Sequence, residues 1–255
     1  MPTGRRDFIR TAASGAALLG LPAFPALPAV PRQDPRIPLD PGFAPLVRLL
    51  EETSRDTLIE EVAARIRNGL GYKELLGALM LAAVRNVQPR PSVGFKFHAV
   101  LVVNSVHLAS LSSPERDRWL PLLWAVDHFK GSQADEKQKG GWTMKPVDES
   151  AVPPPHKARK AFIEALDAWD ETAADAAAAG LARGAGAHET FELLARYGAR
   201  DFRSIGHKAI FTANGWRTLE CMGWAHAEPV LRSLARAFTA HEGQNPANGD
   251  APADR

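Results

Sequence analysis

The spacing of apolar residues constrains this chain more than any other feature of its sequence. Along most of residues 46–239 the apolar side chains recur every three or four positions, beginning with Leu46, Leu49 and Leu50, which is the period of an amphipathic helix. No stretch of useful length alternates between apolar and polar residues, as a half-buried strand would. The sequence therefore predicts an all-α fold, an array of roughly seven or eight helices.

Glycine, proline and short polar stretches separate the expected helices. We expect a break in the first helix near residues 53–54, while Ser113 and Pro114 supply the N-cap and the first position of the fourth. Residues 132–155 contain two adjacent glycines and a triple proline, so they predict a loop between two helical lobes. The expected helices are 46–67, 72–87, 94–111, 114–130, 157–181, 188–197, 203–222 and 224–239.

The N-terminal residues resemble a twin-arginine export signal. Arg5 and Arg6 are followed by two apolar residues and Arg10, then by a weakly apolar run and a small residue, Ala29, where cleavage would fall. The run is too short to span a membrane as a stable helix. Residues 1–29 therefore predict a signal peptide that the twin-arginine translocase reads, a periplasmic or secreted location, and no stable membrane span after cleavage.

Composition divides the remainder into a single domain with two polar ends. Residues 30–45 are rich in proline and are expected to be extended, 46–242 form a single α-helical domain, and 243–255 are expected to be disordered. Beyond the leader the chain carries 28 basic and 28 acidic residues, and this balance argues against nucleic acid as a partner. The single cysteine, Cys221, excludes an intramolecular disulfide and a cysteine-based metal site.

Several familiar catalytic signatures are absent from the sequence. No histidine follows an acidic residue by three positions, and no two histidines lie three or four apart, so the diiron and zinc-helix patterns are missing. The chain also has no nucleophile elbow, no phosphate-binding glycine loop and no dinucleotide fingerprint. The cofactor therefore stays unknown, with a metal or a haem left open.

Histidines placed within apolar helices are the main candidates for chemistry. In the helix expected over 94–111, Asn104 and His107 lie about 60° apart and can share a face, whereas His98 lies about 13 Å from His107 along the axis. In a later helix His207, Asn214 and Thr218 fall within about 40° of one another. A polar stripe in an apolar helix must either be hydrogen-bonded or line a wet cavity.

The histidine of the last expected helix completes the candidate set. His226 precedes Pro229 and is expected at a helix N-terminus, where a neutral imidazole is favoured. We take His98, His207 and His226 as candidate catalytic residues, and Asn104, His107, Asn214 and Thr218 as candidate substrate-binding residues. The Asp127–His128 pair is interpreted as a surface feature.

Two stretches resemble the questin oxidase-like family. Phe95-Lys96-Phe97-His98-Ala99-Val100, followed by Asn104-Ser105, is similar to one helix of that family, and His226-Ala227 followed by Arg232-Ser233-Leu234 is similar to a late segment. The resemblance covers about an eighth of the chain. It implies an all-helical oxidoreductase that oxygenates aromatic polyketides, with His98, Asn104 and His226 as pocket residues. That family's activity is intracellular and uses reduced nicotinamide, so the substrate is not carried over to a chain with an export leader.

Three interpretations of function are open at this stage. The first is an exported oxidoreductase with a histidine-lined pocket for a small organic, aromatic substrate. The second is a metal- or haem-binding protein that uses some of these histidines as ligands. The third is a non-catalytic helical binding or scaffold protein. Short similarities between residues 74–104 and 192–214 also suggest a duplicated helical hairpin.

Overall fold

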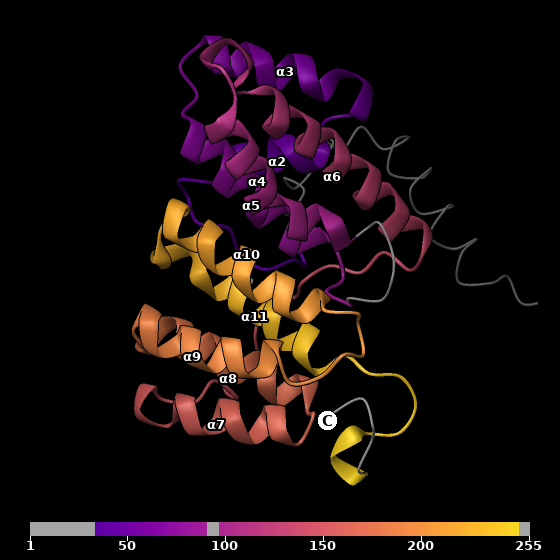
Figure 1. The fold of residues 1–255 in the computed structure, drawn as a ribbon, viewed down its shortest axis with the longest axis vertical. Helices are drawn as coiled ribbons and strands as arrows, with labels where there is room; N and C mark the ends of the chain where they lie inside the picture. Colours follow the sequence, from indigo (N-terminus) through magenta and orange to yellow (C-terminus); the bar gives the residue numbers. More distant parts are fainter. Residues whose placement is uncertain (1–33, 91–96, 250–255) are drawn as a thin grey trace, which may run out of the picture. The chain divides into compact units, whose positions relative to one another are not determined.

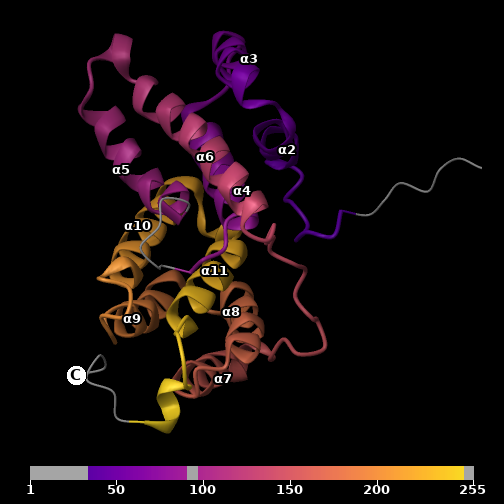
Figure 2. The same cartoon turned by 90° about the vertical axis from the view of Figure 1, so that its right-hand side faces the viewer.

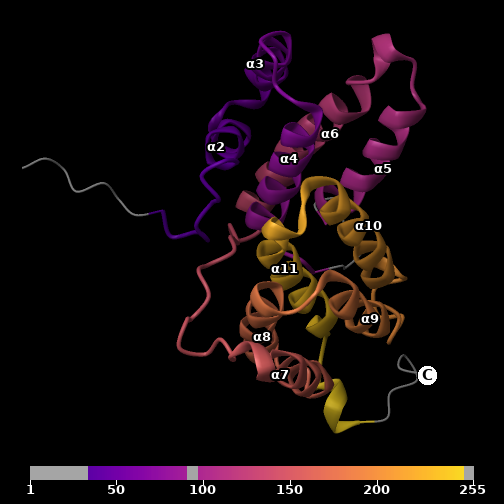
Figure 3. The same ribbon diagram turned by 90° about the vertical axis from the view of Figure 1, so that its left-hand side faces the viewer.

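The computed structural model describes residues 34–90 and 97–249, which belong to one compact unit. Within these residues all regular secondary structure is helical: ten α-helices and three short 3₁₀ turns, joined by loops (Figures 1, 2 and 3). The predicted all-α class is confirmed, and the count is somewhat higher than seven or eight. The helices are α2 (Ala44–Glu52), α3 (Arg55–Arg67), α4 (Tyr72–Asn86), α5 (His98–Ser112), α6 (Leu120–Gln138), α7 (Pro155–Asp167), α8 (Glu171–Gly184), α9 (Ala187–Gly198), α10 (His207–Met222) and α11 (Ala227–Thr239).

Helix α4 lies at the centre of the array. It packs against α2, α5, α6, α10 and α11, and twelve of its fifteen residues are buried. Its first turn is closed by the Glu74 side chain, which accepts a hydrogen bond from the Gly71 N–H at 2.9 Å. An apolar surface on nearly every face requires neighbours on nearly every side, which explains why this segment became the core.

The second half of the chain builds a layer of small residues around α8. Figures 1 and 2 show α7, α8 and α9 gathered together, with α10 and α11 lying between them and α4. The alanines of α8 let α7 and α11 approach closely. At Gly180 an added Cβ would lie 2.9 Å from the Pro153 carbonyl oxygen, so only glycine fits there.

Three expected boundaries are wrong, each for an identifiable reason. The fourth expected helix does not end at Lys130 but continues to Gln138, which confines the expected 132–155 loop to residues 139–154. The end of this helix is polar, and for that reason a loop was expected there. Lys130 and Gln133 are nevertheless buried, and Lys130 Nζ donates a hydrogen bond to Gln133 Oε1 at 2.7 Å. The expected 157–181 helix is two helices, since Trp169 adopts a φ of 56° and Asp170 caps α8.

Other boundaries moved by a few residues. The break at residues 53–54 is present between α2 and α3. Helix α10 begins at His207, four residues later than expected, and residues 224–226 form a 3₁₀ turn before α11. Within the polar tail, Pro246–Asn248 form another 3₁₀ turn, and the Asn245 side chain donates to the Ala168 carbonyl oxygen at 3.0 Å. The polar tail, which was expected to be disordered from residue 243, therefore contains a short 3₁₀ turn.

Other expectations fall outside the described residues. These are the signal peptide over 1–29, the start of the 94–111 helix and the last six residues. None of the described helices is both long and apolar enough to cross a membrane.

Candidate functional site

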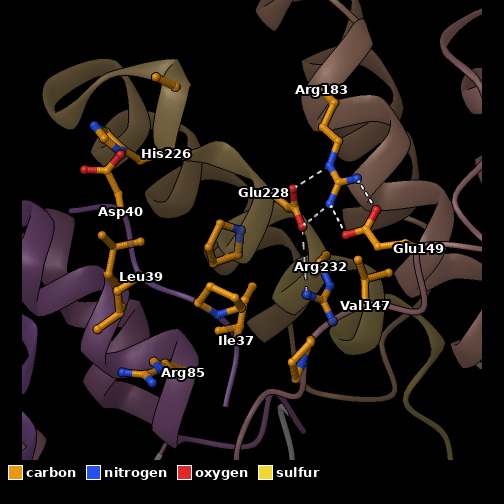
Figure 4. Close-up of a pocket in the computed structure, with 15 residues that line it drawn as sticks. Ile37, Leu39, Asp40, Arg85, Val147, Glu149, Arg183, His226, Glu228 and Arg232 are labelled. Carbon is orange, nitrogen blue, oxygen red and sulfur yellow. Dashed lines mark hydrogen bonds and ion pairs between the residues drawn. The ribbon is translucent and has the colours of Figure 1, made fainter. Parts of the chain in front are cut away.

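A cavity of about 360 Å³ opens beside the start of α11 (Figure 4). Its walls come from four parts of the chain that are distant in sequence: the segment before α2, helix α4, the loop between α6 and α7, and the region around the α8 end and the α11 start. The apolar part of the lining is formed by Ile37, Leu39, Leu81, Val147 and several prolines. Mostly apolar walls with a few polar groups are typical of a small-molecule site.

The buried guanidinium of Arg232 forms part of this wall. Its side chain is about 1% exposed. Asp175 of α8 accepts two hydrogen bonds from it, from Nε at 3.1 Å and from Nη2 at 2.9 Å, and the Lys145 carbonyl oxygen accepts a third at 2.8 Å. The remaining nitrogen, Nη1, has no hydrogen-bond partner among the described residues. Nη1 is itself buried, so it offers no exposed donor to the cavity.

A second arginine holds the rim on the same side of the cavity in place. Arg183 of α8 donates to both oxygens of Glu149 in the loop, at 2.7 and 3.0 Å, and to both oxygens of Glu228 on α11, at 2.8 and 3.1 Å. Glu228 also lies 4.0 Å from Arg232 Nη1. Figure 4 shows this chain of charges running along one side of the cavity. It ties the loop to two helices and fixes the shape of the rim.

The third arginine forms the floor near the segment before α2. Arg85 of α4 is buried; its Nη1 donates to both carboxylate oxygens of Glu51 and its Nη2 donates to Asp34. The backbone of the same region is joined to the loop, because Ile37 N–H donates to the Met144 carbonyl oxygen at 2.8 Å. The loop thus docks on the body through Met144 and also lines the cavity.

His226 is the only one of the predicted catalytic histidines that lines this cavity. Its ring meets the Phe43 ring edge to face, with the centroids 4.7 Å apart. Figure 4 places His226 and Asp40 on the opposite side of the cavity from Arg183. Because His207 begins α10 and His226 follows its end, the two histidines are separated by about 24 Å of helix. One small ligand cannot contact both.

The structure brings the other two candidate catalytic residues together. His98 and His207 are the first residues of α5 and α10, which run parallel, and their ring centroids are 5.5 Å apart. The Nδ1 of His207 lies 2.7 Å from the Ser204 carbonyl oxygen, which favours the tautomer with the proton on Nδ1 and the lone pair on Nε2. Burial, and then the neighbouring His207, lower the pKa of His98.

His128 also lies near His98, and of the Asp127–His128 pair that was expected at the surface only Asp127 has a well-exposed side chain, at 41%. His128 is half-buried, its Nε2 has no hydrogen-bond partner among the described residues, and its ring stacks on Trp124 with the centroids 5.1 Å apart. Burial and the charge of His98 lower its pKa. The carboxylate of the adjacent residue, Asp127, accepts a hydrogen bond from Arg55 Nε at 2.7 Å.

The predicted substrate-binding residues Asn104, Asn214 and Thr218 meet at the contact between α5 and α10. Asn104 Nδ2 donates to Asn214 Oδ1 at 3.2 Å, and Asn214 Nδ2 donates to the Leu101 carbonyl oxygen at 2.8 Å. Thr218 Oγ1 donates to the Asn214 carbonyl oxygen at 2.8 Å. The polar groups of Asn104, Asn214 and Thr218 therefore have hydrogen-bond partners within the protein. A role in substrate binding stays a prediction for these residues.

His107 lies in a different environment, about 13 Å along α5 from His98. Its Nδ1 is 3.1 Å from the Tyr72 hydroxyl, whose ring also packs near Trp119 with the centroids 5.4 Å apart. Burial, followed by Arg118 and Lys73, lowers the pKa of His107. The seven candidate residues therefore fall into three separate places: the cavity, the α5–α10 contact and the Tyr72 neighbourhood.

Across residues 34–90 and 97–249 no group of three or more histidine, cysteine, aspartate or glutamate side chains is arranged to hold a metal ion. Sequence reasoning missed Arg183, Glu228 and Arg232 as cavity residues. One signal was available: Asp175 is a lone acid within an alanine run, and such a carboxylate in a buried helix face requires a cationic partner.

The fold and the cavity together define an all-helical protein with an open cavity that has largely apolar walls. Comparisons with known proteins add no closer identity: no family model, no curated protein and no solved structure matches the chain.

Proposed function

We propose that this protein binds a small organic molecule in the cavity beside α11. The observation that carries the proposal is a cavity of about 360 Å³ with largely apolar walls, whose rim is held in place by the bonds of Arg183 to Glu149 and Glu228. The volume lies within the range of about 300–1,000 Å³ that is usual for small-molecule sites. An apolar ligand would gain roughly 25 cal/mol for each Å² that it removes from water.

Filling the cavity tests this proposal. Val147 lies in the loop and lines the cavity, whereas Val152 lies in the same loop, is similarly half-buried and does not line it. Val147→Trp should block the site and Val152→Trp should serve as the matched control. Binding of aromatic probe molecules is measured by calorimetry and by thermal unfolding, because a ligand at 100 times its Kd stabilises the native state by about 2.7 kcal/mol.

The expected result is binding by the wild type and by Val152→Trp, and at least a tenfold loss of affinity in Val147→Trp. If Val147→Trp binds the same probes with unchanged affinity, the cavity is not the site. If no member of a broad panel of apolar probes binds the wild type, the proposed function is wrong.

A second candidate function is favoured by the contact between His98 and His207. Two imidazoles 5.5 Å apart, one with its Nδ1 directed to a backbone carbonyl, suit a role in which one accepts a proton and the other returns it. The resemblance to the questin oxidase-like family implies an oxidoreductase acting on an aromatic substrate. His98→Ala and His207→Ala should each abolish turnover of such a substrate, while His156→Ala, on the exposed start of α7, should not.

We also propose that the protein works after export through the twin-arginine pathway. The support is the Arg5-Arg6 motif and the apolar run that follows it. Replacing both arginines by lysine should retain the protein in the cytoplasm, as measured by cell fractionation. Unchanged export of that variant would overturn the assignment.

A further inference from the structure

We infer that the ligand of this cavity is an amphiphilic amine: an apolar body that contacts the walls near Leu39 and Val147, and a protonated amino group beside the Asp40 carboxylate. The inference rests on the proposed function, because it assumes that the cavity binds a small molecule. It adds the chemical class of that molecule, which follows from the one carboxylate of the lining that has no ion-pair partner among residues 34–90 and 97–249.

The arginines of the lining are already neutralised by the protein. Each of them lies within 4.0 Å of two carboxylates: Arg85 faces Glu51 and Asp34, Arg183 faces Glu149 and Glu228, and Arg232 faces Asp175 and Glu228. An anionic ligand would approach these arginines only by coming close to the carboxylates that they bind. Because like charges repel, the lining selects against a negative charge.

Asp40 differs from the other two acids of the lining. Glu149 and Glu228 both bond to Arg183, whereas Asp40 forms no ion pair within the described part of the chain. Its side chain accepts one hydrogen bond there, from the Gly42 N–H to Oδ1 at 2.8 Å. A carboxylate has two oxygens and about four lone-pair sites, so Oδ2 keeps its capacity to accept bonds from a ligand.

A ligand in the cavity can reach Asp40, because this residue is exposed and also forms part of the cavity wall. Figure 4 shows its carboxylate beside His226 at one end of the cavity, across from Arg183 and Glu149. The bond from Gly42 holds the carboxylate in a defined position before a ligand arrives. The protein thus presents an oriented negative charge at the edge of an apolar space.

The rest of the wall sets the character of the ligand's body. Ile37 and Leu81 are buried parts of the lining, and Leu39 and Val147 are half-buried parts of it. Apolar contact with these side chains supplies most of the affinity. An ion pair at an exposed carboxylate adds a smaller amount, so Asp40 acts mainly by selecting the charge of the ligand.

Three molecules with one skeleton test the inference: naphthylethylamine, naphthylethanol and naphthylacetate. Their affinities for the full chain are measured by calorimetry at about pH 8, where an alkylamine with a pKa of about 10 is protonated. The amine should bind at least about threefold more tightly than the alcohol, and about tenfold or more tightly than the carboxylate. The preference for the amine should shrink when the salt concentration is raised from about 0.05 M to about 0.5 M.

Asp40→Asn removes the charge and keeps a side-chain oxygen that can accept the bond from the Gly42 N–H. In this variant the amine should lose its advantage over the alcohol, while the alcohol binds as it does to the wild type. Asp148→Asn is the matched control, because Asp148 is an exposed acid of the loop that bonds to Ser150 and does not line the cavity. It should leave all three affinities unchanged.

The outcomes separate this inference from the proposed function. Equal affinities for the three molecules, each reduced by Val147→Trp, would keep the cavity as a binding site and overturn the ligand class. Tightest binding of the alcohol or the carboxylate would overturn it too, as would a preference for the amine that survives Asp40→Asn. If none of the three binds, the inference is wrong, and if a broad panel of apolar probes also fails, the proposed function is wrong as well.

Discussion

Two polar clusters of the helical array differ in what surrounds them. At the contact between α5 and the middle of α10, Asn104, Asn214 and Thr218 bond to one another or to nearby backbone. Beside the start of α11, Arg232 is bonded to Asp175 and to the Lys145 carbonyl oxygen, and Glu228 lies 4.0 Å from its remaining nitrogen. The first cluster closes an interhelical contact, whereas the second lies in the wall of a largely apolar cavity. A polar group in a helix marks a ligand site only when its bonds are not completed by the protein itself.

The largest effect in this comparison should come from Asp175→Ala. The substitution leaves the Arg232 and Arg236 guanidinium groups without their shared carboxylate, and a buried cation without a partner costs about 3–5 kcal/mol. Urea unfolding should show this loss. Asp170→Ala in the same helix removes only an N-cap and should cost about 1 kcal/mol. A loss below 1 kcal/mol for Asp175→Ala would contradict the role given to the pair.

Asn214→Ala should affect the α5–α10 cluster and leave the cavity unchanged. It removes the partner of Asn104 and of the Leu101 carbonyl oxygen, both in the buried contact between α5 and α10, at a cost of about 1–3 kcal/mol. Affinity for a cavity ligand should remain the same, since Asn214 does not line the cavity. Should ligand affinity instead fall tenfold at constant fold, Asn214 would belong to a binding site.

Lowering the pH should reduce the free energy of unfolding by a smaller amount, through the partly buried histidines. The pKa values of His98 and His128 are lowered from 6.5 by burial, so the unfolded chain binds protons more readily than the native protein. Stability present above pH 6.5 is therefore lost as the pH falls through 6.5 toward the lower native values. Urea unfolding at about pH 8 and about pH 5 measures the difference.

Histidine variants show which residues cause the difference in stability between the two pH values. His128→Gln should reduce the loss of stability on acidification, whereas His156→Gln, at an exposed position, should leave it unchanged. A protein equally stable at both pH values would show that these histidines do not titrate with folding.

Arg183→Gln should have the smallest effect. The arginine is 41% exposed on its side chain and pairs with two carboxylates at the surface, and exposed ion pairs contribute about 0.2–1 kcal/mol. The stability difference should shrink further in high salt. A cost as large as that of Asp175→Ala would mean that the rim, and not Arg232, holds the cavity together.

The sequence predicted the all-α class and most helices because three-to-four residue periodicity is a local signal. The break before α3 and the short helix α9 were found in this way. The division between α7 and α8 was missed because no glycine or proline marks the turn at Trp169, although Asp170 after it is a preferred N-cap residue. The 132–138 segment was missed because Gln133 and Glu136 are polar and yet buried.

The site was harder to predict than the fold. Periodicity placed Asn104 and Asn214 on helix faces, and they do meet, but nothing local showed that they satisfy each other. The cavity joins Ile37, Leu81, Val147 and Arg232, which are as much as 195 positions apart, and no local pattern records such a neighbourhood. His226 was selected from a motif, and it is the one predicted residue that lines the cavity.

The most direct test of the central claim is a crystal structure of the protein bound to an aromatic probe molecule. The account predicts that the ring system lies in the cavity beside α11, between Leu81 and Val147. Ligand density between His98 and His207, or a cavity still empty at saturating ligand, would contradict it.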